Sequence, residues 1–275
     1  MILKYLGTAA AEGFPAMFCK CAVCERARRS GGRNIRTRSQ AIVDEELLID
    51  FPADTYLHVL YGGLRLEKVR NLIITHAHSD HLYPADFEMR KEGFAHGLSS
   101  CLTVYGTSAV ISVCCGIPHI ALLEAQGRIA FKQIVPFEPF EAGGYRITPL
   151  AANHDAAAGP VFYLVEKGNE ALLYANDTGY FPEETWQYLE KSRPGIGLVS
   201  FDCTCGIYDN RNGHLGFPNV LEVRERLYEI GCISKESIIA ITHFSHNGGA
   251  TYDEMCETAE KEQILVAYDG MKIEV

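Results

Sequence analysis

The sequence has no long hydrophobic run, and this absence excludes one class of protein. None of its apolar stretches approaches the roughly 20 residues that a transmembrane helix needs. Residues 1–6 lead as a strand into Gly7 and do not form a signal peptide. We therefore expect a protein that neither spans a membrane nor is secreted.

Positive charge is also in short supply. The formal net charge of −10 argues against broad electrostatic capture of nucleic acid, so we expect no stable nucleic acid partner. Arginines nevertheless gather in residues 26–38, a short distance after Lys20. Such a cluster is usually a solvated helix face or a set of ion pairs, and the alternative is a patch that recognises phosphate. The sequence leaves both interpretations open.

A disulfide framework is missing as well, although the chain has 10 cysteines. Reduced thiols in apolar or helical surroundings fit a cytoplasmic protein. No linker or low-complexity segment interrupts the sequence, so the whole chain, residues 1–275, is expected to form one domain with a large core. The cysteines that show no framework spacing are Cys101, Cys114, Cys115, Cys232 and Cys256.

The sequence does contain a dense cluster of metal-ligand side chains. His76, His78, Asp80 and His81 fall within six positions, directly after the apolar run 71–74. Neutral imidazoles and a carboxylate suit zinc, manganese or iron, and a loop that leaves a buried strand can aim them together. They cannot all converge on one small ion without crowding, so we expect two ions. A solvated polar turn is the alternative, which the density of ligands disfavours.

Three further candidate ligands stand at the ends of other predicted strands. They are His154, Asp177 and His243, and each follows an apolar or alternating segment. A single histidine at a strand end is more often a structural residue than a ligand. The same layout at three places favours ligands that complete the site.

A second group of ligands lies near the start of the chain. Cys19, Cys21 and Cys24 have the spacing Cys-x-Cys-x-x-Cys, which can curl a short loop, residues 17–30, around one tetrahedral ion. Three thiols leave this ion one ligand short, so a distant residue must close the site, and Cys205 is one candidate. We expect a structural zinc that fixes the N-terminal loop to the catalytic face. Three ordinary buried thiols are the alternative.

The remaining periodicity indicates a layered α/β protein. The order of elements fits two packed sheets with helices outside, but the alternation alone suits several layered architectures. Strands are predicted at residues 40–43, 47–49, 71–74, 102–105, 129–135, 145–150, 162–165, 171–176, 198–202 and 237–242, and helices at 182–191, 218–230 and 252–261.

On these residues the chain resembles the metallo-β-lactamase superfamily. The motif His-x-His-x-Asp-His at residues 76–81, followed by the three strand-end ligands, keeps the superfamily's order. The resemblance implies a four-layer αββα sandwich, and an aspartate bridge between the metals is similar to the phosphodiesterase and nuclease branch. It further implies that His76, His78 and His154 hold one metal, that Asp80, His81 and His243 hold the other, and that Asp177 bridges them.

Closer still is the resemblance to PhnP-type cyclic phosphodiesterases. Residues 7–15, the cysteine triplet and the arginine-rich segment after it match that family, as do residues 212–214, 242–246 and 269–271. The resemblance points to His246 as the fourth ligand of the structural zinc. It also implies a small phosphodiester substrate and makes a homodimer plausible.

A metal pair predicts hydrolysis. Two dications depress the pKa of a bound water, so a bridging hydroxide can attack a phosphodiester while the metals neutralise charge on its oxygens. The leaving oxygen needs a proton, and His214, in a polar loop that contains glycine, is the candidate donor. A surface-loop role fits its spacing equally well, and the resemblance favours catalysis. Asp80 and Asp177 are the other expected catalytic residues.

Two other functions are compatible with the same ligands. A tRNA 3′-processing nuclease shares the metal chemistry but needs a basic arm, and the sequence has no such insertion. An iron-dependent oxidoreductase or a metal-binding scaffold on the same fold is the second. Cyclic ribose phosphates, 2′,3′-cyclic nucleotides and short linear diesters are all possible substrates. His58, His96 and His119 show no ligand pattern and are expected to be structural or surface residues.

Overall fold

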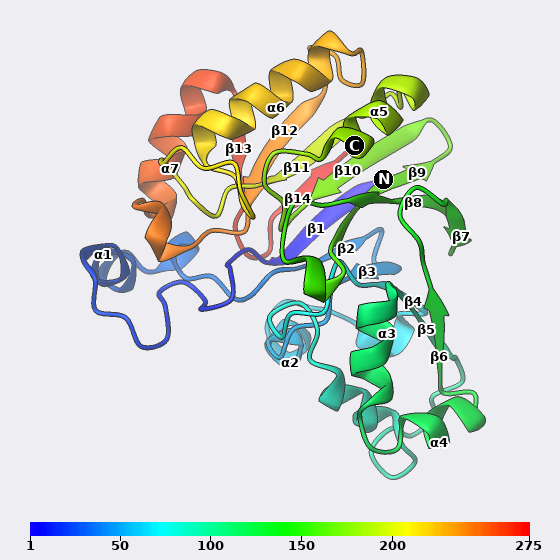
Figure 1. Ribbon diagram of the computed structural model, residues 1–275. Helices are drawn as coiled ribbons and strands as arrows, with labels where there is room; N and C mark the ends of the chain where they lie inside the picture. Colours follow the sequence, from blue (N-terminus) through cyan, green and yellow to red (C-terminus); the bar gives the residue numbers. More distant parts are fainter.

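Two seven-stranded β-sheets form the centre of the molecule (Figure 1), and the computed structural model describes all residues from 1 to 275. The first sheet has the order β14-β1-β2-β3-β4-β5-β6. Strands β3 to β6 run parallel to one another, whereas β1 pairs antiparallel with β2 and β14. The strands are β1 (Ile2–Gly7), β2 (Gln40–Val43), β3 (Leu47–Ile49), β4 (Asn71–Ile73), β5 (Leu102–Gly106), β6 (Ile129–Gln133) and β14 (Lys272–Glu274).

The second sheet has the order β13-β12-β11-β10-β9-β8-β7. Strands β10 to β13 are parallel, and β8 runs in their direction because β9 is antiparallel to both β8 and β10. The carboxyl ends of these parallel strands therefore share one edge. The strands are β7 (Phe140–Ala142), β8 (Tyr145–Ala151), β9 (Val161–Lys167), β10 (Glu170–Ala175), β11 (Leu198–Asp202), β12 (Ile238–Thr242) and β13 (Leu265–Val266).

Helices cover the outer face of each sheet (Figure 1). The first sheet is covered by α2 (Thr55–Leu60), α3 (Ser108–Cys115) and α4 (Ile120–Ala125), and the second by α5 (Glu183–Ser192), α6 (Phe217–Glu229) and α7 (Tyr252–Ala259). Helix α1 (Ala22–Ser30) lies to one side of the sheets. The predicted four-layer αββα sandwich is confirmed. Short 3-10 helices are η1 (Gly32–Asn34), η2 (Leu66–Lys68), η3 (Pro84–Arg90), η4 (Ala156–Ala158), η5 (His246–Gly248) and η6 (Glu260–Glu262).

Three apolar cores hold the four layers together. Along β10, Leu172 and Tyr174 face the core between the sheets, whereas Leu173 and Ala175 face the core under α5 to α7. This alternation follows from the two-residue period of a strand buried on both faces. The third core joins the first sheet to α3 through residues such as Val110. Because each large buried side chain contributes about 1.5–3 kcal/mol, the strand ends are held rigidly.

Every strand and helix that the periodicity predicts is present, with ends shifted by one or two residues at most. The elements α1, α2, α3, α4, β7, β13 and β14 were not predicted, because segments of two to nine residues carry little periodic signal. Residues 22–30 of the predicted zinc loop, 17–30, form helix α1 instead. All ten cysteines are free. No helix combines the length and the apolar character needed to cross a membrane.

Candidate metal centre

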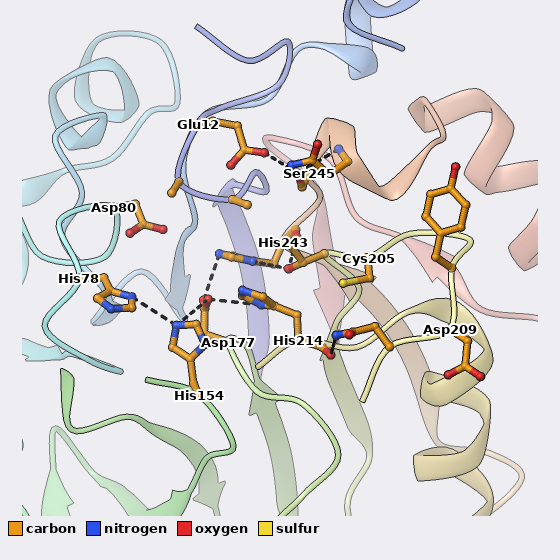
Figure 2. Close-up of a pocket in the computed structure, with 16 residues that line it drawn as sticks. Glu12, His78, Asp80, His154, Asp177, Cys205, Asp209, His214, His243 and Ser245 are labelled. Atoms are coloured by element: carbon orange, nitrogen blue, oxygen red, sulfur yellow. Dashed lines mark hydrogen bonds and ion pairs between the residues drawn. The ribbon is translucent and has the colours of Figure 1, made fainter. Parts of the chain in front are cut away.

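The predicted ligands come together at the carboxyl ends of strands from both sheets (Figure 2). Residues 76–81 follow β4 of the first sheet, whereas His154, Asp177 and His243 follow β8, β10 and β12 of the second. The carboxyl ends of parallel strands meet at one edge of a sheet, and the packing of the sheets brings the two edges together. The candidate ligands that follow separate strands in the sequence therefore lie together in one site.

His76, His78 and His154 form the first group of converging ligand atoms. His76 Nε2 lies 3.0 Å from His78 Nδ1, and His154 Nε2 lies 3.2 Å from the same atom. Two nitrogens that bind one tetrahedral zinc at about 2.0–2.1 Å are roughly 3.3 Å apart. The three ring nitrogens thus have the spacing of ligands around a single metal ion.

Asp80, His81 and His243 form the second group. His81 Nε2 lies 3.2 Å from His243 Nε2 and 3.3 Å from Asp80 Oδ2. Both histidines are buried, and Asp80 is partly exposed where it lines the cavity. The grouping is the one that the superfamily resemblance implies.

The Asp177 carboxylate lies between the two groups. Its Oδ2 is 2.8 Å from His81 Nε2 and 3.0 Å from His243 Nε2, whereas its Oδ1 faces His154 Nε2 at 3.8 Å. Oδ2 is buried and has no well-aligned hydrogen-bond donor. A buried carboxylate oxygen without a donor is costly, so these contacts fit atoms that share a cation. The arrangement suits a metal on each side of Asp177.

The far nitrogen of each ligand histidine contacts an oxygen atom. His81 Nδ1 lies 2.7 Å from Asp50 Oδ2, and His243 Nδ1 lies 2.7 Å from Thr204 Oγ1. Such outer contacts fix the tautomer and ring orientation of metal-binding histidines. With the outer nitrogen held in this way, the lone pair of the other ring nitrogen points toward the group of candidate ligands. The other outer contacts are His154 Nδ1 with Gly213 O (3.1 Å), His78 Nε2 with Asp155 Oδ2 (3.1 Å) and His76 Nδ1 with Thr75 Oγ1 (3.0 Å).

The electrostatics of the centre favour a cation. Burial raises the pKa of the Asp177 carboxyl, but the neighbouring His243 and His81 outweigh burial and hold that pKa well below its usual range. Burial lowers the pKa of His81, but Asp177, Asp50 and Asp80 outweigh it and hold that pKa well above its usual range. The buried carboxylates therefore require positive charge, which either protons or metal ions can supply.

His214 borders the same ligands but has a different partner. Its Nδ1–H donates to Asp202 Oδ2 at 2.8 Å, and Nδ1 is 3.7 Å from Asp177 Oδ1. Burial lowers the pKa of His214, but Asp202 outweighs burial and raises that pKa to about 9. Asp202 also accepts the backbone N–H groups of Thr204 and Leu215. Because these hydrogen bonds already satisfy Asp202, we assign it to His214 rather than to a metal.

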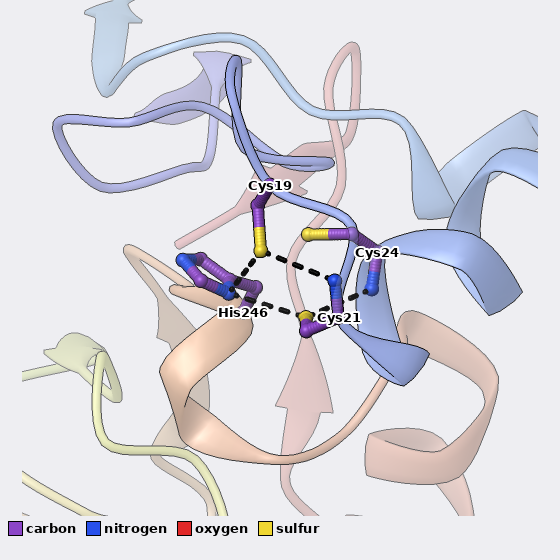
Figure 3. A group of neighbouring side chains, drawn as sticks. All are labelled: Cys19, Cys21, Cys24 and His246. Atoms are coloured by element: carbon purple, nitrogen blue, oxygen red, sulfur yellow. Dashed lines mark hydrogen bonds between the residues drawn. The ribbon is translucent and has the colours of Figure 1, made fainter.

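The cysteine triplet meets His246, as Figure 3 shows. His246 Nδ1 lies 3.5 Å from Cys19 Sγ and 3.4 Å from Cys21 Sγ, and Cys24 Sγ belongs to the same group. A sulfur and a nitrogen bound to one tetrahedral zinc are roughly 3.6 Å apart. Cys205, the other candidate for the fourth ligand, instead lines the cavity of the metal centre.

The start of α1 lowers the pKa of one of these thiols, that of Cys21. Cys21 caps the helix, and its Sγ accepts the backbone N–H of Cys24. That hydrogen bond is the main cause that lowers the pKa of the Cys21 thiol to about 6. Burial raises the pKa of Cys24 to about 12. Cys21 is therefore largely a thiolate at neutral pH, which is the form that binds metals.

Comparison with known proteins identifies the family. A sequence profile of the beta-lactamase superfamily domain matches residues 54–260, which is more than half of the chain. The chain belongs to the β-lactamase superfamily. Together with its ligand groups, this membership makes it a metallo-hydrolase of the β-lactamase fold. The cysteine triplet lies before the matched region.

Several known proteins are similar to this chain in sequence or in fold. Ribonuclease Z of Listeria innocua is 26% identical over 149 residues, which are 53% of this chain and 48% of that protein. The chain thus spans about half the length of the curated relatives that it matches first. Zinc-bound PqqB from Methylobacterium extorquens has a TM-score of 0.78 at 18% identity, with 100% of both chains covered. A diphosphatase from the PhnP family has a TM-score of 0.72 at 22% identity, with 100% of this chain and 96% of that chain covered. The predicted superfamily is confirmed, and a PhnP-family protein is among the chains that share its fold.

A cavity of about 610 Å³ opens over the candidate metal ligands. His78, Asp80, His154, Asp177 and His243 form its inner end together with His214 (Figure 2). The outer walls come from three segments of the chain. Their residues are Ala10, Ala11, Glu12, Thr204, Cys205, Tyr208, Asp209, Asn210, Ser245 and Asn247.

Several residues that orient the centre were not predicted from the sequence. Asp50 directly follows β3 and Asp202 is the last residue of β11, so both stand at a strand end like the other residues. Thr204 lies two residues beyond Asp202. A search of the end of every predicted strand finds both aspartates, but it does not say which carboxylates face a metal and which face a histidine.

The arginine-rich segment lies outside the cavity. Arg26 pairs with Glu254, Arg38 pairs with Asp54 at 3.1 Å, and the buried Arg36 donates to Ala267 O at 2.6 Å. No arginine lines the cavity. These contacts support a set of ion pairs and structural hydrogen bonds rather than a patch that recognises phosphate.

The remaining histidines belong to neither ligand group. His58 is buried, and its Nδ1 lies 2.5 Å from Gln40 Oε1 while its Nε2 lies 2.7 Å from Thr37 Oγ1. His96 and His119 are exposed. These positions are the structural and surface ones that the sequence predicts.

Proposed function

We propose that this chain is a phosphodiesterase that uses two divalent metal ions to hydrolyse small cyclic phosphodiesters, in the manner of PhnP-type enzymes. The observation that supports it most directly is the position of Asp177. Its two oxygens face two separate groups of ligand atoms, and Oδ2 is buried without a hydrogen-bond donor. An aspartate in this position also resembles the phosphodiesterase and nuclease branch of the superfamily.

The ligand groups define where the metals would bind. When bound, two such ions supply an activated water molecule and neutralise the charge that builds on phosphate oxygens. A mixed set of imidazoles and carboxylates suits zinc, manganese or iron. His76, His78 and His154 would hold one ion, Asp80, His81 and His243 the other, Asp177 would lie between them, and Cys19, Cys21, Cys24 and His246 would hold a structural zinc.

In this proposal His214 donates a proton to the leaving oxygen. Because its Nδ1–H is committed to Asp202, its Nε2 is the ring atom available to the cavity. The Asp202 carboxylate accepts from Nδ1–H and favours the protonated imidazole. A positioned general acid of this kind accelerates a reaction by roughly 10²- to 10⁴-fold.

The cavity supports a small substrate. Its volume of about 610 Å³ lies within the roughly 300–1,000 Å³ of typical small-molecule sites. A nucleotide-sized cyclic phosphodiester fits such a volume. We also propose that the protein binds this small phosphodiester in the cytoplasm and that it forms a homodimer.

A tRNA 3′-processing nuclease is the second candidate, because about half of this chain is similar in sequence to about half of a ribonuclease Z. Such an enzyme needs positive charge to bind a polyanion. No lysine or arginine lines the cavity, and the net charge of the chain is −10. These features favour the small substrate. The iron-dependent oxidoreductase has no supporting observation beyond the shared fold.

One experiment tests the proposal. Metals are quantified in the freshly purified protein, and the same sample is then assayed on a cyclic phosphate, a linear diester, a lactone and a thioester. We expect about three metal ions per chain, two at the centre and one at the cysteines, and a preference for the cyclic phosphate. Preference for an acyl substrate would overturn the phosphodiesterase proposal, and oxygen-dependent turnover with bound iron would support the oxidoreductase.

A further inference from the structure

His214 lies on a segment without regular secondary structure. Residues 203–216 connect β11 to α6 and contain no helix or strand. Loops of this kind are the more mobile parts of a protein unless neighbouring segments hold them. A general acid, in contrast, has to lie within hydrogen-bond distance of the leaving oxygen. The contacts that hold this loop therefore determine whether His214 can act.

Backbone and carboxylate contacts fix the two ends of the loop. Cys205 N–H donates to Leu215 O at 3.0 Å, and Leu215 N–H donates to Asp202 Oδ1 at 3.1 Å. Asp202 Oδ2 also accepts the Nδ1–H of His214, which sets the orientation of the imidazole ring. None of these contacts involves the backbone of residues 211–214, so other groups have to hold that segment.

The side-chain amide of Asn210 holds this segment from within the loop. Its Nδ2 donates to His214 O at 2.7 Å and to Asn212 O at 2.9 Å. The backbone N–H of Asn210 donates to Oδ1 of the buried Asn219 on α6 at 2.8 Å. The amide thus starts from a fixed position, and its two donors set the position of the backbone that carries the acid.

Asn153 attaches the same segment to the strand ends that carry metal ligands. It directly precedes the candidate ligand His154, and its Nδ2 donates to Arg211 O at 3.2 Å and to Tyr180 O at 3.3 Å. The backbone N–H of Tyr180, three residues after Asp177, donates to the same Arg211 O at 2.8 Å. One carbonyl of the loop is therefore held from the ends of both β8 and β10.

Two further contacts keep the loop close to the metal centre. A Cβ atom at Gly179 would lie 2.1 Å from Arg211 O, so only glycine permits this close approach of the two backbones. His154 Nδ1 lies 3.1 Å from Gly213 O. The imidazole rings of His154 and His214 have centroids 4.9 Å apart, as Figure 2 illustrates. The position of the acid is therefore tied to the position of a metal ligand.

We propose that Asn153 and Asn210 are positioning residues for the general acid His214. Asn210 fixes the shape of residues 210–214, and Asn153 fixes where that segment lies relative to the metal ligands. Both Nδ2 groups donate to backbone carbonyls, so both amides act through the backbone that carries His214. This inference rests on the proposed phosphodiesterase function.

The first test separates loss of the acid from general damage. Asn153→Ala and Asn210→Ala, loaded with metal, are assayed on adenosine 2′,3′-cyclic phosphate and on bis(p-nitrophenyl) phosphate. We expect kcat to fall by about tenfold on the first substrate and by less than about twofold on the second, because only the first leaving group needs a proton. The metal content should not change. Equal losses on both substrates overturn the inference.

The matched control is Asn169→Ala, which removes an exposed asparagine from the turn between β9 and β10. This variant should match the unaltered protein on both substrates. A selective loss in the control, of the size expected for Asn153→Ala, would also overturn the inference.

The second test combines each substitution with His214→Ala. If the amides act through His214, they have no acid left to position in this background. Asn153→Ala should then lower the kcat of the His214→Ala protein by less than about twofold, and Asn210→Ala likewise. A further tenfold loss would show that the amides act independently of His214, which contradicts the proposal.

Hydrogen exchange gives a readout that does not depend on activity. In the metal-loaded protein, removal of either amide should accelerate exchange in peptides that cover residues 208–217 by about threefold or more, while peptides from α5 stay unchanged. Unchanged exchange in the loop overturns this inference alone. Failure of the unaltered protein to hydrolyse either compound, with both metals bound, overturns the proposed function itself.

Discussion

The metal centre and the cysteine site differ in how they are built. The centre collects its ligands from four strand ends in two sheets, and His76, His81, Asp177 and His243 are all buried. The cysteine site takes three ligands from residues 19–24, at the start of α1, and only His246 from elsewhere, and three of its four ligands are partly exposed. One site therefore depends on the whole fold, whereas the other is nearly complete within a few residues.

The difference agrees with the two roles that we propose, catalysis at the centre and structural support at the cysteines. The ligands of the centre have outer partners such as Asp50 and Thr204, and they face a cavity that can admit a substrate. The cysteine site has four protein ligands and no open position, which is typical of structural zinc. The two sites meet at the end of β12, where His243 and His246 are three residues apart.

Removing Asp177 is expected to produce the largest effect. Asp177→Ala takes away the carboxylate between the two groups, so kcat/KM for a cyclic phosphodiester should fall by at least about a thousandfold. Metal analysis should show loss at the centre while the zinc at the cysteines persists. If both sites lose metal together, they are not independent.

His214→Ala should have the next largest effect. We expect kcat to fall by roughly a hundredfold on a substrate with a poor leaving group and much less on a nitrophenyl ester, whose leaving group needs no proton. The metal content should not change. His119→Ala, which alters an exposed histidine, is the matched control. Full activity of His214→Ala on the poor leaving group would remove this residue from the mechanism.

Asp50→Asn tests the outer contacts of the centre. The substitution keeps the shape but removes the charge that faces His81 Nδ1, so metal affinity should weaken by about 10- to 100-fold. Titration with zinc or manganese, monitored by activity, measures this change. An affinity equal to that of the unaltered protein would show that Asp50 only fills space.

Cys21→Ser should give the smallest change in catalysis. Loss of one zinc ligand loosens the N-terminal segment, and we expect the melting temperature to fall by about 5 °C, which corresponds to roughly 2–3 kcal/mol in a chain of this size. The kcat/KM of the folded protein should change by less than about threefold, because Cys19, Cys21 and Cys24 do not line the cavity. A loss of activity as large as that of Asp177→Ala would make the cysteine site part of the catalytic centre.

Local sequence determined much of this protein. Each candidate ligand was predicted from a short segment of the sequence. These segments are residues 76–81, the strand ends before His154, Asp177 and His243, and the cysteine triplet. The long apolar and alternating runs fixed most strands in the same way. These signals are local because a strand period and a ligand spacing both extend over only a few residues.

Only the tertiary structure decided how these pieces act together. In the folded chain His246, and not Cys205, lies beside the cysteine triplet. Asp50 and Asp202 contact histidines, and Glu12 and Asp209 line one cavity. Nothing in the neighbouring sequence indicates that residues 12 and 209 line the same cavity. The physical reason is that a cavity and its charge arise from the packing of two sheets, which places side chains from distant segments within a few ångströms of one another.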